Sequence, residues 1–155
     1  MNTKFLFQAG LSAMLLCGCA SRQHFVLERN KEIIHRYFEE WANHGDTKAA
    51  DELNANNVTL RNPPAVVHSL EDYKKGMATF HTAFPDLHFT IEEEIAEGDK
   101  VLVRWSLRAT HRGDYQGRPP TGKTVSVTGM SLFRLAEGKI QEITVSLSLA
   151  SRNRT

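Results

Sequence analysis

The stretch Phe84–Trp105, FPDLHFTIEEEIAEGDKVLVRW, decides the fold because the period of the apolar pattern changes within it. Before Pro85, apolar residues recur every three or four positions, as in amphipathic helices. After Pro85 they alternate with polar residues, as in strands with one buried face. The pair Gly98-Asp99 separates two alternating runs and predicts a tight hairpin. Helices therefore come first, and an antiparallel meander follows.

Two of the three expected helices lie between Phe25 and Leu53. The first, Phe25–Asn43, has an apolar face at helical spacing, formed by Ile34, Phe38 and Trp41. Gly45 can adopt the left-handed conformation that ends a helix, and Asp46 can cap a second, short helix that ends at Leu53.

The third expected helix begins at a capping box and ends at a proline. Ser69 and Asp72 form the S-x-x-D pattern, and Pro85 stops the helix. Its apolar face is formed by Tyr73, Met77, Phe80 and Phe84. Upstream, a brief strand around Val58–Arg61 should stop at Asn62, which precedes two prolines.

Four strands are expected after Pro85. In the first, Leu87, Phe89, Ile91 and Ile95 should point inward, and in the second Trp105 and the residues in phase with it. Two more strands, about Thr124–Leu135 and Lys139–Leu149, meet at a hairpin at Glu137-Gly138. The prediction is an α+β fold in which a strongly curved antiparallel sheet wraps over three N-terminal helices and leaves a pocket between the layers.

The N-terminus has the features of a secretory signal. Lys4 precedes an apolar run, Phe5–Leu16, that is too short to span a bilayer. The run ends in LCGC, which resembles the lipobox of bacterial lipoproteins and implies cleavage after Gly18 and acylation of Cys19. A plain secretory signal is the alternative. The expected organisation is a signal peptide (1–18), a short tether (19–24), one domain (25–150) and a tail (151–155).

The lipobox resemblance implies that the chain is anchored in the bacterial cell envelope, outside the cytoplasm. Two or more acyl chains at Cys19 would hold it firmly to a membrane. Ala20 follows the cysteine where an Asp would indicate inner-membrane retention. This favours the outer membrane, on its periplasmic side, if the source has one.

Composition and motif searches exclude several classes of function. The chain is 41% hydrophobic and 24% charged, and without Lys4 its 18 remaining basic residues equal its 18 acidic ones, which disfavours nucleic acid as a partner. Both cysteines lie before residue 20, so the domain has neither a disulfide nor a sulfur ligand. No nucleotide, zinc or serine-hydrolase motif occurs, and the seven histidines lack metal-ligand spacing, so neither a metal nor a cofactor is expected.

The chain contains three elements in order, which are FPDLHFTIEEEIAEGDKVLVRW, THRGDYQGRPPTGK and FRLAEGKI. Through these elements it resembles the SnoaL-like polyketide cyclases and their "ester cyclase" relatives over about Asn30–Leu147. The resemblance implies the cone-shaped nuclear-transport-factor-2-like fold, a hydrophobic pocket at the mouth of the cone, and often a homodimer packed through the sheet face. Characterised members close rings by aldol chemistry without a cofactor. They use a carboxylic acid and a histidine on the last two strands.

The last strand, GKIQEITVSLSLA, departs from this family pattern. Relatives commonly have Trp and Asp where Thr144 and Val145 stand, and Ser131 occupies the partner position on the preceding strand. No Asp or Glu follows Glu142. The expected acid and histidine positions are therefore Val145 and Ser131, which places the cyclase activity in question.

Two other residues are weak candidates for a relocated acid or base. His111 lies in phase with the inward residues of the Trp105 strand, although a strand-end histidine bonded to the hairpin is the simpler interpretation. Glu93 is in the inward phase of its strand and could be a buried acid, unless a bulge turns it outward.

The expected pocket lining combines aromatic, aliphatic and polar residues. It consists of Tyr37, Trp41, Asn62, Phe80, Phe84, Trp105, Ser131 and Val145. The aromatic members are expected to be core residues first and pocket walls second, and Asn62 is equally suited to a local turn. On the outer sheet face, Arg104, Arg108 and Arg112 are expected to form cross-strand charge pairs or a dimer surface rather than an anion site.

Three functions follow from these observations. The first is a lipid-anchored SnoaL-like domain that binds a small hydrophobic organic molecule. The second is a cofactor-free cyclase, isomerase or hydratase with a relocated acid or base. The third is a non-catalytic envelope domain whose sheet face binds a protein.

Overall fold

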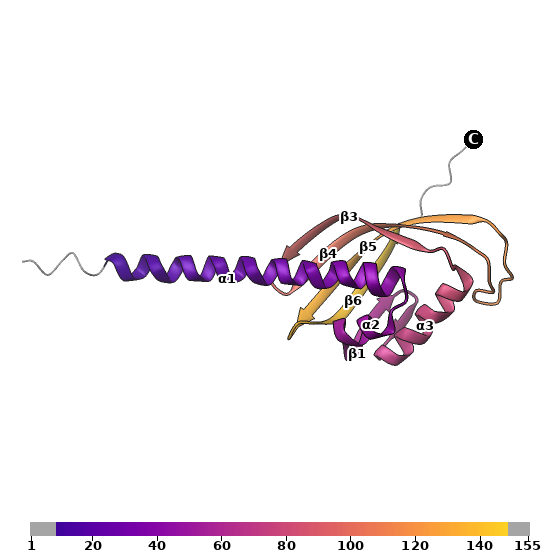
Figure 1. Cartoon of the computed structure of the whole chain (residues 1–155), viewed down its shortest axis with the longest axis horizontal. Helices are drawn as coiled ribbons and strands as arrows, with labels where there is room; N and C mark the ends of the chain where they lie inside the picture. The colour runs from indigo at the N-terminus through magenta and orange to yellow at the C-terminus, as the bar shows by residue number, and fades with distance from the viewer. Residues whose placement is uncertain (1–8, 149–155) are drawn as a thin grey trace, which may run out of the picture.

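The structure is a computed structural model that describes the backbone of residues 9–148 and the side chains of 21–147. A curved, open sheet has the strand order β2-β1-β6-β5-β4-β3, and helices cover its concave face (Figure 1). The elements in chain order are α1 (Ala9–Arg36), the π-helical η1 (Tyr37–Asn43), α2 (Thr47–Leu53), β1 (Asn54–Asn62), β2 (Ala65–Val67), α3 (Leu70–Ala83), β3 (His88–Glu97), β4 (Lys100–Thr110), β5 (Thr124–Ala136) and β6 (Lys139–Ser148).

The α+β prediction is confirmed, with one correction to the sheet. Strands β3 to β6 form the expected antiparallel meander, with hairpins at Gly98 and Gly138. However, β1 pairs with β6 in parallel, with Leu60 opposite Ile143. Two strands can pair in parallel only if a long connection joins them. Strand β1 meets this condition because α3 and the rest of the meander lie between β1 and β6 along the chain. The short strand β2, which was not expected, pairs with β1 just after the two prolines.

The first helix is longer than its periodicity predicts. It begins at Ala9, not at Phe25, so the residues expected to form a tether, 19–24, are helical. No proline interrupts this alanine- and leucine-rich run. The predicted acylation at Cys19 concerns a side chain outside those described, and residues 1–8 of the predicted signal peptide also lie outside the described residues. Among the described residues, no helix combines the length and the apolarity needed to cross a membrane.

The predicted helix caps are confirmed. Asp46 accepts hydrogen bonds from the N–H groups of Lys48 (2.9 Å) and Ala49 (3.4 Å) at the start of α2. Ser69 accepts one from the N–H of Asp72 (3.1 Å) at the start of α3. Gly45 follows η1 with a φ of +69°, as expected for a residue that ends a helix.

A bulge in β3 turns Glu93 outward, as the bulge alternative predicts, and corrects the predicted orientation of Glu94 and Ile95. The register with β4 shifts between Ile91 and Glu93, so Glu93 faces outward and Glu94 faces α1. The Oε2 of Glu94 lies 3.1 Å from the Nε2 of His35. Ile95, which was expected inside, is 59% exposed. One additional residue in a strand moves every following side chain to the opposite face.

Candidate functional site at the mouth of the cone

Burial along the inner face of the sheet shows where the cone opens. On β6, Ile143 is 1% exposed, Val145 is half-buried and Leu147 is 52% exposed. On β5 the same trend runs from the fully buried Phe133 to the half-buried Val127 and Val125 at the other end of the strand. The core is therefore closed near the hairpins and becomes accessible towards the β4–β5 connection.

Around this opening, half-buried apolar side chains from the sheet, α3 and the β4–β5 connection pack against the core. We call this set the cone mouth; it consists of Leu60, Val67, Met77, Phe80, Tyr115, Val125, Val127 and Val145. Phe80 and Val145 were predicted as pocket residues. Tyr115 was not, because it lies in a connection where no periodic pattern indicates which way a side chain points.

His111 is the buried ionisable side chain beside the cone mouth. It is 8% exposed and stacks on Phe84, with ring centroids 5.1 Å apart. Its Nδ1 lies 3.2 Å from Oγ1 of Thr121. Its Nε2 is buried and has no hydrogen-bond partner among the described residues. An unpaired buried polar atom costs about 1–3 kcal/mol, so a polar group that reached this nitrogen would recover that cost.

The motif THRGDYQGRPPTGK forms the connection that holds these aromatic rings. The N–H groups of Arg112 and Gly113 both donate to the carbonyl of Ala83, at the end of α3. A Cβ on Gly113 would lie 2.6 Å from the Thr82 carbonyl oxygen, so this close approach requires glycine. Tyr115 is thereby placed against Phe80 and Phe84, with ring centroids 5.6 and 5.3 Å away.

The positions expected to carry the family's acid and histidine form part of the wall. Ser131 and Val145 are opposite each other on β5 and β6. Ser131 is 4% exposed, and its hydroxyl accepts a hydrogen bond of 2.9 Å from the indole N–H of Trp105. A Cβ on Gly129 would lie 2.5 Å from the same indole ring. Trp105 therefore packs over the segment of β5 that faces Val145.

Tyr37, Trp41 and Tyr73 lie deeper in the core. The hydroxyl groups of Tyr37 and Tyr73 share a hydrogen bond, and Trp41 packs edge-on against Tyr73. Burial raises the pKa of both tyrosines above the ordinary value, so both stay neutral. Since Trp41 is 1% exposed, it belongs to the floor of the cone, below the mouth.

Two polar residues singled out in the sequence, Glu93 and Asn62, lie away from the cone mouth, as does His81. Glu93 is outside because of the bulge, and its carboxylate is 3.3 Å from Nε of Arg104. Asn62 is exposed at the edge of the sheet, where it pairs with Ala65 in the β1–β2 hairpin, and so it does not line the cone. His81 lies on α3 near Gly45, and burial lowers its pKa. The described residues include no group of three potential metal ligands.

Solved structures resemble this fold over most of its length. A proposed SnoaL-like polyketide cyclase from Jannaschia sp. CCS1 has 28% identity and a TM-score of 0.73, covering 79% of this chain and 87% of its own. IdmH, a proposed polyketide cyclase from Streptomyces antibioticus, has 25% identity and a TM-score of 0.67 (77% and 91% covered). AclR, a proposed hydroxylase from Streptomyces galilaeus, has 25% identity and a TM-score of 0.70 (79% and 77% covered). No curated protein matches the chain.

The curved sheet over three helices, open at one end, defines an α+β protein with the nuclear-transport-factor-2-like cone fold. Within that class, the model of the SnoaL-like polyketide cyclase family matches residues 32–149. The chain belongs to the SnoaL-like polyketide cyclase family.

Proposed function

We propose that this protein binds a small, mainly apolar organic molecule at the cone mouth, and that His111 supplies its polar contact. The observation that carries the proposal is the buried, unpaired Nε2 of His111, whose ring stacks on Phe84. Phe84 in turn packs against the half-buried rings of Phe80 and Tyr115. Binding sites for small molecules combine apolar walls with a few placed polar groups. Membership of the SnoaL-like family supports the same location, because the resemblance to this family implies a hydrophobic pocket at the mouth of the cone.

We also propose that the aldol chemistry of the family is lost. An enolate mechanism needs an acid and a base beside the substrate. At the two expected positions stand Val145, which cannot ionise, and Ser131, whose hydroxyl is engaged by Trp105. These two side chains therefore favour a protein that binds its ligand without converting it.

A mouth-filling substitution tests the binding proposal. The probe is the fluorescent aromatic dye 1-anilinonaphthalene-8-sulfonate, and the matched variants are Val127→Trp, at the cone mouth, and Leu132→Trp, on the opposite face of the same strand. We expect saturable binding to the original protein and to Leu132→Trp, and a loss of about tenfold or more in affinity for Val127→Trp. Equal binding by all three proteins would contradict the proposal.

The second candidate function is catalysis by His111 as a relocated base. The unpaired Nε2 also favours this function, because a buried imidazole beside a bound molecule can accept a proton. Mass spectrometry of a co-purified ligand after prolonged incubation distinguishes the two functions. Conversion that His111→Ala abolishes supports catalysis, whereas recovery of unchanged ligand supports binding alone.

Attachment to the cell envelope through an acylated Cys19 is part of the proposal. If Cys19 carries the lipid, about 16 Å of helix separates it from Asn30, which is bonded to the β3–β4 hairpin at Gly98. The cone mouth lies at the opposite end of the domain from this projecting helix (Figure 1). A ligand would then enter from the aqueous side, not from the bilayer.

The anchor can be tested with the neighbouring cysteine as its control. We expect the mass of the mature chain to include the acyl groups in the Cys17→Ser variant and to lack them in Cys19→Ser. Envelope fractionation should release only the second variant. Retention of both variants in the membrane fraction would contradict acylation at Cys19.

A homodimer through the outer sheet face is also proposed. Ile95, Leu102 and Leu132 are in register across β3, β4 and β5, and all three are exposed. Exposed apolar patches of this kind favour association. Sedimentation should show a dimer that Leu102→Glu dissociates and that Val66→Glu, at the β2 edge, leaves intact. A monomeric original protein would contradict the proposal.

A further inference from the structure

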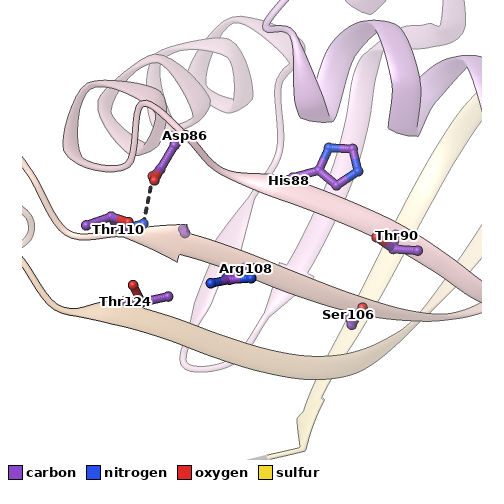
Figure 2. Close-up of a pocket in the computed structure, with 8 residues that line it drawn as sticks. Asp86, His88, Thr90, Ser106, Arg108, Thr110 and Thr124 are labelled. Carbon is purple, nitrogen blue, oxygen red and sulfur yellow. Dashed lines mark hydrogen bonds between the residues drawn. The ribbon is translucent and has the colours of Figure 1, made fainter.

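A polar hollow of about 440 Å³ lies on the outer face of the sheet, away from the cone mouth (Figure 2). It spans β3, β4 and the start of β5, and its lining carries hydroxyl, imidazole, carboxylate and guanidinium groups. The polar lining residues are Asp86, His88, Thr90, Ser106, Arg108, Thr110 and Thr124. Arg108 lies in the middle of this set, between Thr110 and Thr124 at one end and Thr90 and Ser106 at the other.

The arginines expected to form charge pairs on this face behave differently from one another. Arg104 pairs with Glu93 at 3.3 Å, and Arg112 lies 3.7 Å from the carboxylate of Asp86. Within the part of the chain whose side chains are described, Arg108 forms neither an ion pair nor a hydrogen bond. The expectation of charge pairing is therefore wrong for Arg108.

The nearest acids are engaged elsewhere. Oδ1 of Asp86 accepts a hydrogen bond of 2.7 Å from the N–H of Thr110, and its other oxygen faces Arg112. Its pKa is lowered by the hydrogen bonds from Thr110, so the carboxylate stays ionised. Glu92 accepts a hydrogen bond of 2.6 Å from the hydroxyl of Ser106. The Asp86–Arg112 pair balances itself, and the hollow keeps the positive charge of Arg108.

Strand register sets polar groups around the guanidinium. Arg108 has His88 opposite it on β3 and Ser126 opposite it on β5. Two residues further along β4 on the same face, Thr110 is opposite Thr124 of β5. Two residues back along β4, Ser106 is opposite Thr90 of β3. The hydroxyl groups of Thr90 and Thr124 can donate to a ligand or accept from it. The proton of the Ser106 hydroxyl is donated to Glu92, so this group can only accept, and the Thr110 side chain is bonded to Asp86. A guanidinium presents a planar fork of donors that matches a carboxylate or a phosphate.

We propose that this hollow is a second binding site, which takes a small hydroxylated molecule through its phosphate or carboxylate group, with Arg108 as the anion contact. The ligand would lie on the outer sheet face, so the site is independent of the cone mouth and of the proposed function there. The hydroxylated part of the ligand would contact the paired residues Thr90 and Ser106.

The test is a titration of the ¹⁵N-labelled full chain, followed by amide NMR shifts, with three probes that share one skeleton. Glycerol 3-phosphate and glycerate carry the two anions, and glycerol carries neither. We expect saturable shifts of amides in residues 88–90, 106–110 and 124–126 with at least one of the anionic probes and none with glycerol. The stronger anionic probe identifies the preferred group. No saturation with either anion at tens of millimolar would overturn the proposal.

Matched variants separate the site from general surface charge. Arg108→Gln should weaken binding of the stronger probe about tenfold, the factor expected for losing a charge-assisted hydrogen bond. Arg104→Gln removes the same charge from the same strand outside the hollow and should leave affinity within about twofold. Arg108→Lys keeps the positive charge but loses the planar pair of guanidinium donors, so its affinity should lie between those of Arg108→Gln and Arg104→Gln. Equal weakening by Arg104→Gln would show a nonspecific ion effect only and would also overturn the proposal.

Discussion

The surroundings of Trp105 explain why the last two strands of the sheet form a wall. Its indole ring covers Gly129, and its N–H is bonded to Ser131, which lies opposite Val145. An ionised acid at Val145 would lie opposite this buried Trp105–Ser131 pair, and partial burial there disfavours its charged form. The proposed loss of the family's histidine and acid at Ser131 and Val145 is therefore consistent with the position of one tryptophan.

Gly129→Ala is predicted to destabilise the protein by about 1–3 kcal/mol, the usual range for overpacking a core. The added Cβ would lie 2.5 Å from the indole and 2.9 Å from the carbonyl oxygen of Ser146. The control is Gly76→Ala, in the open middle of α3, where nothing lies within 4 Å. That change should stabilise by about 0.5–1 kcal/mol through helix propensity. Urea unfolding measures both, and a neutral Gly129→Ala would contradict the packing described.

His81 is predicted to make stability fall in mild acid. Burial lowers its pKa in the folded protein, so the unfolded chain binds the proton more readily. The contribution of His81 to stability is complete above the ordinary histidine pKa, near 6.5, and is lost as the pH falls below it and through the lowered pKa of the folded protein. Urea unfolding at several pH values should show a smaller decrease for His81→Gln than for the original protein. Identical pH profiles would contradict the assignment.

At the scale of the elements, two kinds of signal differ in how well they predict structure. Caps and hairpins are local, because Ser69, Asp46 and Gly138 act within a few residues of themselves. Strand faces are not local once a bulge occurs. Nothing in the alternating segment around Glu93 indicates where the additional residue lies, since the register is determined by pairing with β4.

Ser69→Ala is predicted to lower stability by about 1 kcal/mol through loss of the α3 cap. Ser69→Thr keeps the hydroxyl acceptor and should retain most of the stability. Thermal and urea unfolding of the two variants provide the comparison. Equal destabilisation by both changes would indicate that some other property of Ser69, not its capping hydroxyl, stabilises the helix.

At the scale of the whole molecule, α1 has two parts with different surroundings. Its C-terminal part packs on the sheet, where Asn30 donates to the carbonyl of Gly98 (3.2 Å) and Arg29 lies near Gly138. Its N-terminal part projects beyond the hairpins, and Phe25 there is 67% exposed (Figure 1). The folded unit therefore depends on the part of α1 that follows Phe25.

A chain that begins at Phe25 is accordingly predicted to unfold within about 2 °C of the full chain, because it keeps the helix contacts with both hairpins. A chain that begins at Lys31 loses Arg29 and Asn30, and its midpoint should fall by several degrees. Calorimetry measures both midpoints. A large decrease in the first chain would show that the projecting helix contributes to folding.

Local and compositional features were predictable from the amino-acid sequence alone. They include the α+β order, the helix caps, the hairpins and the inward phase of Trp105 and His111, because each depends on neighbouring residues or on a short period. The family pattern also identified Val145 and Ser131 as departures. Only the tertiary structure decided the parallel β1–β6 pair, the outward turn of Glu93, the unpaired Nε2 of His111 and the unpartnered Arg108. These depend on contacts between residues far apart in the chain, and one bulge or one competing partner is enough to change them.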